Sequence, residues 1–580
     1  MRRLAWVVAL VLAMAGCSEV PASGPVERYP RSAQSSVAPG VQIAAAAPRV
    51  GATPDEVLAG YLSAMATYQA GYPAAKLFLT PDAAEKWNPD EGITVYEAEG
   101  HRPITTATSA IVDVPVVGTV TSDGHYVAVQ NTTLRHNFSM TLSEGEWRIG
   151  DAPQGLLISQ RSFERYFRAT LLYFLSPRAT TMAPEVVYLP AGNTNPTMAL
   201  QALLRGPSAW LRPAVLNAIP AGTSMTIPAV VIDRLGVAVV PLTGQIAGLP
   251  DSQRSQLAAQ VVWTLARFPE VNGVTFTSDG QPFAVPNQDD AGVIRLSDFR
   301  DHQIVAEPVI TDAFVVNQGI LGRLDEHANG QFIGWSGAFG KTDWGDTVGD
   351  FGLGHDGAAV AVVNADRTRL FTGAADSSAA VRRYVGTGLG RPQVMRDASV
   401  WVSTKDATGR AALVLIEASG KVTTFHPAGL EKASIDAFSV SPDGTRIAVV
   451  ARTGATSALG LLRVQRGAGV VDGWRVVPIV GAQGAVVDFG DVGWTDPVTL
   501  TLLGSVAGDT AFSVYSADLD GGSIETIGPF DVDAIGLATQ PRPTGRTALI
   551  LAEGGIVWRY ENVYRWRQLA AEVTAIGYAH

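Results

Sequence analysis

The chain opens with a short apolar segment behind a basic pair. Arg2 and Arg3 are followed by residues 4–16, which are uncharged and mostly apolar. As a helix, this run would extend about 20 Å at roughly 1.5 Å per residue, which is less than the roughly 30 Å of a bilayer's hydrocarbon core. A basic start, a short apolar run and small residues at its end are typical of a secretory signal peptide. We therefore predict a signal peptide over residues 1–16 rather than a membrane-spanning helix.

The next segment shows no hydrophobic periodicity. Residues 18–50 are rich in Pro, Ser, Ala and Gly, as in "SEVPASGPVERYPRSAQSSVAPG". Such a composition cannot bury a core and favours a flexible linker. We predict a linker over residues 17–50, whose root-mean-square reach would be about 30 Å if it were fully flexible.

Residues 51–160 begin with a helical pattern and continue with strands. Thr53 is a candidate N-cap, Pro54 fits the first helical position and Glu56 stands three residues after the cap. Apolar residues then recur at helical spacing at Val57, Leu58, Tyr61, Leu62, Met65 and Tyr68. A second short helix starts at "TPDAAEKW", and alternating segments from Ile93 onward predict antiparallel strands. This order predicts a small α+β domain.

Residues 175–295 alternate between strand and helix patterns. "PEVVYLPAG" predicts a strand, "PTMALQALLRGPS" a helix that ends at Gly206, and residues 216–242 two strands around a turn at residues 233–236. "DSQRSQLAAQVVWTLARFP" predicts a helix capped by Asp251 or Ser252, and a hairpin follows it. The run at residues 162–176 is apolar on several faces, so its pattern fits a helix or a strand. We predict a second α+β domain.

Residues 310–580 consist of short strands between Gly/Asp turns. The clearest unit is "SVSPDGTRIAVVA", in which the turn at residues 442–444 joins two strands. Comparable strands recur at irregular intervals close to the ~40–50 residues of a propeller blade. Closing such sheets into a ring removes their free edges. We predict a β-propeller of five to seven blades, and the sequence leaves open whether the last strand, at residues 573–580, completes the first blade.

Composition and charge narrow the possible functions. The 580 residues are 47% hydrophobic and 17% charged, and the net charge is −11. The length suggests three or four domains, and the acidic balance argues against nucleic acid as a partner. The chain has one cysteine, Cys17, which excludes an internal disulfide and a site with several thiolate ligands, such as many zinc sites.

Cys17 directly follows the signal peptide. Met14, Ala15 and Gly16 precede it, and this stretch resembles the lipobox of bacterial lipoproteins with Met in place of the usual Leu. In that motif the thiol is alkylated by diacylglycerol, and cleavage makes the cysteine the new N-terminus. Two or more acyl chains, such as palmitate, hold a protein at a membrane far better than one chain. We therefore predict lipidation of Cys17; an inert cysteine in a discarded signal and a twin-arginine signal fit the flanking residues less well.

One glycine-rich stretch resembles two catalytic motifs without meeting either. "GWSGAFGKTDWGD" contains Gly340-Lys341-Thr342, but the first Gly of a phosphate-binding loop would fall on Trp335. A nucleophile elbow around Ser336 would need Gly at position 338, which is Ala. We interpret the stretch as a structural turn with Trp335 and Trp344 packed or partly exposed.

Other polar clusters also favour structural roles. Asp346, Asp350, His355 and Asp356 lie in a glycine-rich stretch that lacks the ligand order of a calcium loop. The carboxylate pairs Asp518/Asp520 and Asp531/Asp533 fall on predicted turns, and the eight histidines form no ligand pair at helical spacing. We predict no catalytic residues, no metal site and no cofactor.

Two resemblances combine these observations. "VVYLPAG", "ALLRGPS", "AIPAGTSM" and "VTFTSDGQP" resemble the GerMN module, which was first named in spore-germination proteins. The order of signal peptide, linker, α+β domain, GerMN-like domain and propeller resembles the actinobacterial LpqB lipoprotein family over essentially the whole mature chain. That resemblance implies a lipid-anchored protein on the outer face of the plasma membrane. It also implies binding to the extracytoplasmic domain of the sensor kinase MtrB, with effects on two-component signalling, envelope homeostasis and division.

The expected function is therefore that of a non-enzymatic accessory protein. Two alternatives stay open at this stage. A binding protein for cell-wall glycan or peptide would show exposed aromatic residues in the propeller channel or in a cleft of the GerMN-like domain. A propeller enzyme acting on sugars would show carboxylates at a catalytic separation, with other titratable groups, at the channel mouth.

Overall fold

The computed structural model describes most of the chain after the linker. The described residues are 46–106, 108–192, 195–305, 307–325, 330–375, 377–481, 484–528 and 532–579. The chain from Ala46 onward forms one compact unit. Within the described ranges no helix combines the length and the apolarity needed to cross a membrane. The predicted signal peptide, most of the predicted linker and Cys17 lie outside these residues.

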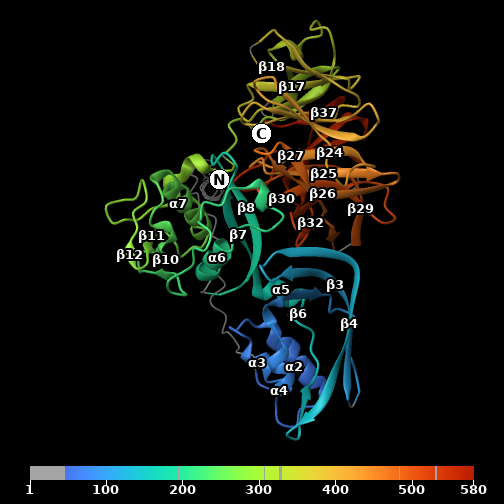
Figure 1. The fold of residues 1–580 in the computed structure, drawn as a ribbon. Helices are drawn as coiled ribbons and strands as arrows, with labels where there is room; N and C mark the ends of the chain where they lie inside the picture. Colours follow the sequence, from blue (N-terminus) through green and yellow to red (C-terminus); the bar gives the residue numbers. More distant parts are fainter. Residues whose placement is uncertain are drawn as a thin grey trace, which may run out of the picture. The chain divides into compact units, whose positions relative to one another are not determined.

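The first folded domain is an antiparallel sheet with one parallel strand pair and helices beside it (Figure 1). Its strand order is β5-β4-β3-β1-β6, with β2 paired to β3. The elements are α2 (Pro54–Ala66), α3 (Pro73–Lys76), α4 (Pro81–Lys86), β1 (Gly92–Tyr96), β2 (Ile104–Thr105), β3 (Ser109–Thr121), β4 (Tyr126–Ser143), β5 (Glu146–Ile149) and β6 (Leu156–Ser159). Strands β3 and β4 form its long hairpin.

Helix α2 shows why this domain packs as its sequence predicts. The Glu56 carboxylate accepts the Thr53 backbone N–H at 2.9 Å and so satisfies one of the free donors at the helix start. The apolar stripe of the helix is buried, and Tyr61 lies edge-on to Trp87 and Phe138 with ring centroids 5.7 and 6.2 Å away. The stripe therefore anchors the helix to the sheet.

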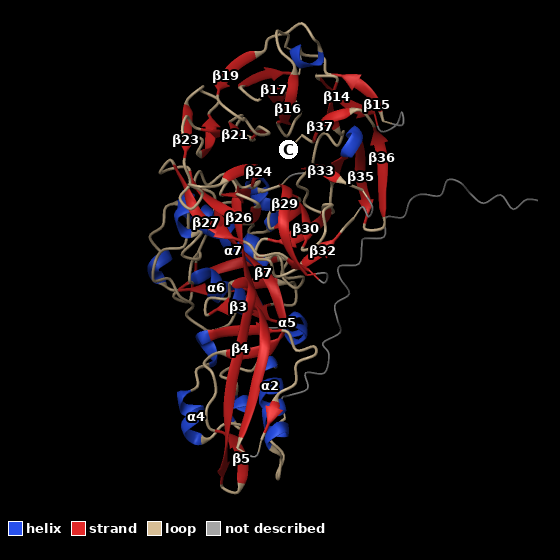
Figure 2. Cartoon of the chain, turned by 90° about the vertical axis from the view of Figure 1, so that its right-hand side faces the viewer, coloured by secondary structure: helices blue, strands red, loops and turns tan. Residues whose placement is uncertain are grey.

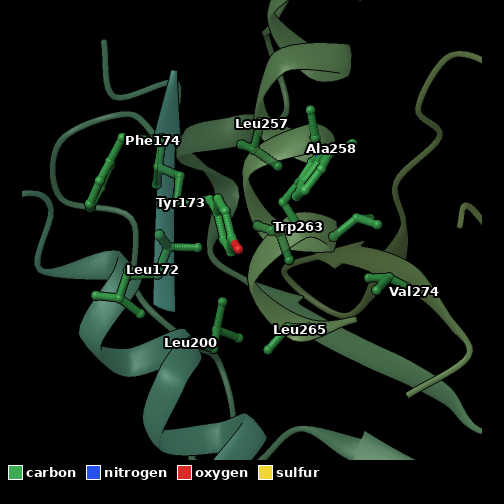
Figure 3. Packing of buried hydrophobic residues seen from close by; sticks show 14 of the residues in the cluster. Leu172, Tyr173, Phe174, Leu200, Leu257, Ala258, Trp263, Leu265 and Val274 are labelled. Atoms are coloured by element: carbon green, nitrogen blue, oxygen red, sulfur yellow. The ribbon is translucent and has the colours of Figure 1, made fainter. Parts of the chain in front are cut away.

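The second domain builds one core from a hairpin, a mixed sheet and two helices. Its elements are α5 (Gln160–Tyr166), β7 (Phe167–Leu175), β8 (Met182–Pro190), α6 (Asn195–Leu204), β9 (Val231–Ile232), β10 (Val237–Leu242), α7 (Asp251–Leu265), β11 (Gly273–Ser278) and β12 (Gln281–Pro282). Leu172 and Tyr173 of β7, Leu200 of α6 and Trp263 of α7 point into this core (Figure 3). The core takes in residues on both sides of the predicted range 175–295, including β7 and Phe299.

Local structure differs from the expectation at two places in this domain. The run at residues 162–176 is helix up to Tyr166 and strand from Phe167. Its pattern fitted a helix or a strand, and each forms in one part of the run. Residues 216–230 form no strand ahead of the turn at residues 233–236; Met225 makes an isolated bridge to Leu242, and the short strand Val231–Ile232 pairs with β10. Pro220 and Pro228 have no N–H for a ladder, which accounts for the irregular path. Helix α7 begins at Asp251 after Pro250 rather than after Asp251 or Ser252.

The third domain is a propeller whose described strands form six blades around a ring (Figure 2). Blade 1 is β37, β13, β14 and β15, and the later blades are β16–β19, β20–β23, β24–β27, β28–β32 and β33–β36. The strand bounds of blades 1 to 3 are β13 (Phe314–Asn317), β14 (Ile320–Asp325), β15 (Gln331–Gly334), β16 (Val348–Leu353), β17 (Ala359–Asn364), β18 (Arg369–Ala374), β19 (Val381–Val385), β20 (Gln393–Val394), β21 (Val400–Lys405), β22 (Ala411–Ile416) and β23 (Val422–Phe425).

Blades 4 to 6 follow the same antiparallel order, with one extra short strand in blade 5. Their bounds are β24 (Ser434–Val440), β25 (Arg446–Thr453), β26 (Thr456–Gln465), β27 (Val470–Val476), β28 (Val480–Gly481), β29 (Gly484–Trp494), β30 (Thr499–Val506), β31 (Ser513–Asp518), β32 (Ile524–Thr526), β33 (Ala534–Thr539), β34 (Ala548–Ala552), β35 (Ile556–Asn562), β36 (Arg565–Ala570) and β37 (Val573–Gly577). Six blades fall within the predicted range of five to seven.

The end of the chain closes the ring. Strand β37 pairs antiparallel with β13, with Ile576 opposite Val315 and Ala575 opposite Val316. It also packs against β16 of blade 2 and β33 of blade 6. The last strand therefore completes the first blade, which the sequence had left open. The predicted fold class, two α+β domains followed by an all-β propeller, is confirmed.

We predict that trimming one side chain of the closing strand destabilises the propeller. Ile576 is 0% exposed and packs in a cluster with Leu549 and Val557 of blade 6. Ile576→Ala should cost about 2–5 kcal/mol, because the deletion leaves a cavity in a well-packed core. The measurement is the urea midpoint of the propeller transition. Thr574→Ser, on the exposed side of the same strand, keeps the hydroxyl that donates to the Val316 carbonyl. It is the control and should change the midpoint little; equal midpoints for both variants would contradict the role given to β37.

Candidate functional site

Several sequence-predicted residues have structural partners. In residues 334–346, the Trp335 ring lies edge-on to Phe314, and Trp344 lies between Phe339 and Phe371. The Ser336 hydroxyl donates to the Ala375 carbonyl at 2.6 Å. These contacts support a packed turn rather than a catalytic loop.

The acidic residues of the next stretch are directed to different partners. Asp346 pairs with Arg369 at 3.2 Å, and Asp350 pairs with Arg391 at 3.5 Å. The Asp356 carboxylate accepts the backbone N–H of Ala358 at 3.0 Å. Nowhere in the described part of the chain do three or more His, Cys, Asp or Glu side chains gather as metal ligands would.

Of the predicted carboxylate pairs, Asp518 and Asp520 lie where three domains meet. Asp520 accepts the Gly522 backbone N–H at 2.8 Å, as expected of a turn. Its own carbonyl accepts the N–H of Ala128 in β4 at 3.3 Å, which joins blade 5 to the first domain. Burial, and then the charges of Asp520 and Asp496, raise the pKa of Asp518 to about 7. Of the other pair, Asp531 lies outside the described residues.

A buried ion pair joins the propeller to the hairpin β7–β8. The Arg446 and Asp443 side chains are 4% and 0% exposed, and their charged atoms lie 3.1 Å apart. Arg446 also donates to the carbonyl of Pro184 in β8. Asp443 lies in the turn at residues 442–444 that the sequence predicted, and Gly444 completes that turn at φ +69°. A turn predicted for strand connection is therefore also an interdomain contact.

Trp210 makes a second contact of the same kind. Its indole N–H donates to the Gly473 carbonyl at 2.6 Å, and Arg463 donates to the Trp210 carbonyl at 2.8 Å. The Arg475 guanidinium lies 4.7 Å from the centroid of the indole ring, within the range of a cation–π contact. The second domain is therefore fixed to blade 4 at two points.

Beside these contacts lies a cavity of about 210 Å³, here named the channel-mouth cavity. Three parts of the chain line it: the β7–β8 turn with Arg178, the connector at residues 304, 305 and 307–309, and turns of the propeller blades. The propeller contributes His355, residues 394–397, residues 440–444, Arg466, Gln540, Pro541 and Ala579. The cavity is therefore formed only when the second domain and the propeller are in contact.

Two of the three carboxylates at this cavity, those of Asp397 and Asp443, are already paired. Asp397 lies 2.9 Å from Arg178 and also pairs with Arg466. Burial acts to raise the pKa of Asp397, but hydrogen bonds from Ser399 and the charge of Arg466 outweigh it and lower the pKa to about 2. Asp443 is held by Arg446 and by the hydroxyls of its own turn. Asp397 is thus ionised at neutral pH and unsuited to proton transfer there.

The sequence did not reveal this cavity, because its residues are separated by up to some 400 positions along the chain. The "SPDGTR" turn was the one available signal, since an Asp and an Arg three residues apart can pair. Arg178, Arg396 and Arg466 carry no motif. Their convergence depends on the hairpin β7–β8 meeting blades 3 and 4.

Sequence comparisons agree with this architecture. Residues 47–164 match the family described as lipoprotein LpqB, N-terminal domain; residues 171–284 match "Sporulation and spore germination"; and residues 322–575 match the lipoprotein LpqB beta-propeller domain. Lipoprotein LpqB of Cutibacterium acnes is 32% identical over 99% of this chain and 98% of its own length. That of Streptomyces coelicolor is 26% identical, with 91% and 90% covered. The first GerMN domain of the Bacillus subtilis sporulation protein GerM is 21% identical, covering 21% of this chain and 90% of that one, with a TM-score of 0.18.

Fold and sequence together define a class: a lipoprotein that carries a GerMN-type domain and a six-bladed propeller. The family assignment rests on relatives that match the chain from end to end, and does not depend on the match of one domain alone. The chain belongs to the lipoprotein LpqB family. This confirms the resemblance stated from the sequence.

We predict that Asp518→Asn stabilises the protein more at pH 8 than at pH 5. A pKa raised to about 7, against about 3.9 in the unfolded chain, means that folding takes up a proton. The stability of the natural protein therefore falls as pH rises from about 4 to 7, whereas Asn carries no such charge. Melting temperatures at the two pH values test this.

Asp533→Asn removes an exposed carboxylate on the same propeller and should leave the pH profile unchanged. A lower melting temperature of Asp518→Asn at both pH values would show that the ionised carboxylate stabilises the fold, contrary to this prediction.

Proposed function

We propose that this protein is a lipid-anchored accessory protein on the outer face of the plasma membrane. In this proposal its folded domains bind the extracytoplasmic domain of a sensor kinase of the MtrB type and influence two-component signalling, envelope homeostasis and division. The observation that carries the proposal is the end-to-end match to a lipoprotein, which extends over 99% of the chain and so includes the leader with Cys17.

Lipid attachment at Cys17 fits the rest of the chain. The described residues offer no helix that could hold the protein in a membrane, so lipidation would supply the attachment. A linker from Cys17 to the first described residues would let the folded part reach away from the bilayer. The binding surface would then face the periplasmic or cell-wall side, where a kinase displays its outer domain.

The propeller supports binding rather than catalysis. Its ring is closed by β37, so the blades form a rigid platform with turns and edge strands available to a partner. At the channel mouth, the ionisation of Asp397 and the pairing of Asp443 leave neither carboxylate free for acid–base work. This weakens the alternative of a propeller enzyme acting on sugars.

The alternative of a glycan-binding protein lacks its expected feature at the same place. Among the described residues that line the channel-mouth cavity there is no Trp, Tyr or Phe on which a sugar ring could stack. The most exposed large aromatic residue, Tyr564 at 95%, lies in the β35–β36 turn. The outer domain of a sensor kinase is a protein, and binding it does not require an aromatic residue on which a sugar ring stacks.

We predict that Cys17→Ser abolishes lipid attachment. Without the thiol no thioether to diacylglycerol can form, and the chain should lose labelled palmitate and partition into the aqueous phase of a detergent phase separation. Ser18→Ala keeps the thiol and serves as the matched control, which should stay labelled and membrane-bound. Label retained by Cys17→Ser would contradict lipidation at this residue.

We further predict saturable binding between the soluble protein and the outer domain of the sensor kinase from the same organism. The protein would start at Ser18, which keeps all of the compact unit from Ala46 onward. Calorimetry should show a Kd in the micromolar range or tighter, and the outer domain of an unrelated kinase from that organism should give no binding. Equal heats for the two kinases, or none at high concentration, would remove direct kinase binding by the soluble domains.

A further inference from the structure

We propose that the channel-mouth cavity is a binding site for a small anionic amphiphile, a molecule with one carboxylate or phosphate group and a short aliphatic body. This inference concerns a ligand rather than a protein partner and does not depend on kinase binding. It rests on the walls of the cavity and on the arginines around it.

The inner wall of the cavity is apolar. Ile304 and Val305 of the connector, Val394 of β20 and Val440 of β24 line it, and they are 3%, 7%, 3% and 5% exposed. Such a wall favours hydrocarbon over a polar ligand. A volume of about 210 Å³ is well above the ~10–15 Å³ that a cavity needs to hold one water molecule. A short aliphatic body of several carbons therefore fits.

The rim of the cavity supplies positive charge. Arg178 and Arg466 share one carboxylate, that of Asp397, which leaves an excess of one positive charge. Arg396 lies beside them, and no hydrogen bond or ion pair joins it to another described residue. A guanidinium offers a planar fork of N–H donors that matches carboxylate and phosphate groups. The arginine at residue 396 is thus a ready anion contact.

Arg396 differs from Arg391, another arginine of the propeller, in having no carboxylate that offsets its partial burial. Burial alone lowers the pKa of Arg396, because no carboxylate offsets it. In Arg391, burial acts in the same direction, but Asp491 and Asp350 outweigh it and raise the pKa. An arginine that is partly removed from water without a counter-ion is stabilised when an anion binds beside it.

The remaining charged and titratable groups at the cavity do not cancel this excess. Asp443 is neutralised by Arg446. Glu307 lies on the connector at the exposed rim and His355 in the β16–β17 turn. Counting the arginines Arg178, Arg396 and Arg466 against the carboxylates of Asp397 and Glu307, the rim keeps one net positive charge. A cationic amphiphile is therefore disfavoured.

The test is a calorimetric titration of the protein from Ser18 onward, without detergent, with four eight-carbon probes and acetate. Octanoate or octyl phosphate should bind saturably with one site per chain, and the tighter of the two identifies the head group. Octanol, octylamine and acetate should bind at least tenfold more weakly. Octanol or octylamine binding as tightly as both anions, or no saturable binding of either anion up to millimolar concentration, would overturn the proposal.

Variants place the site. Arg396→Ala should weaken the binding of the tighter anion at least tenfold. Because no hydrogen bond or ion pair joins this side chain to another described residue, its loss should leave the melting temperature unchanged. Arg234→Ala removes an exposed arginine from the β9–β10 turn, away from the cavity lining, and should bind as the natural protein does. Glu307→Gln should bind equally or more tightly. Unchanged affinity of Arg396→Ala, or equal losses in Arg396→Ala and Arg234→Ala, would show that the anion does not bind here.

Discussion

The buried guanidinium of Arg446 is the constraint on which the arrangement of the second domain and the propeller depends. Removing an ion pair from water costs several kcal/mol per ion unless geometry and further hydrogen bonds compensate. Here Asp443 supplies the counter-charge, and the Pro184 carbonyl takes another of the guanidinium donors. Separating the hairpin β7–β8 from blade 4 would leave that donor without its partner. This contact therefore fixes the position of the hairpin on blade 4. The same position brings Trp210 against blade 4 and forms the channel-mouth cavity.

Two arginines inside the propeller are each paired with two carboxylates, whereas no ion pair joins Arg396, at the channel-mouth cavity, to another described residue. Arg391 is matched by Asp350 and Asp491, and Arg452 by Asp436 and Asp488. The Arg391 pairs and the Arg452–Asp488 pair thus hold blades together. Arg396 lines the same cavity as the apolar wall and the two arginines that share one carboxylate. The Arg396 guanidinium has no hydrogen bond or ion pair to another described residue, and a bound anion would supply one. Such a departure from full pairing is expected of a binding residue.

Local pattern predicted the elements well where the signal and the packing agree. The stripe of α2 and the turn at residues 442–444 follow directly from periodicity and turn chemistry, because neighbours within a few residues decide them. Residues 216–230 follow an irregular path although the alternation of apolar residues predicts a strand. Alternation does not take into account that Pro220 and Pro228 lack the N–H groups that a strand ladder needs. Closure by β37 and the meeting of Arg178 with Asp397 could not be predicted, because each joins segments more than 200 residues apart in a way no local pattern specifies.

The position of the cavity gives it a consequence that a pocket inside one domain would lack. Its lining comes from the hairpin, the connector and the propeller, so a bound molecule contacts all three. By linkage, a ligand that binds only the assembled arrangement stabilises it, by an amount that grows with the logarithm of ligand concentration over Kd. A partner that recognises the assembled domains would then be bound more tightly in the presence of the ligand, and by the same factor would tighten the ligand's own binding. An accessory protein of the proposed kind could in this way make its affinity for a partner depend on a small anionic amphiphile.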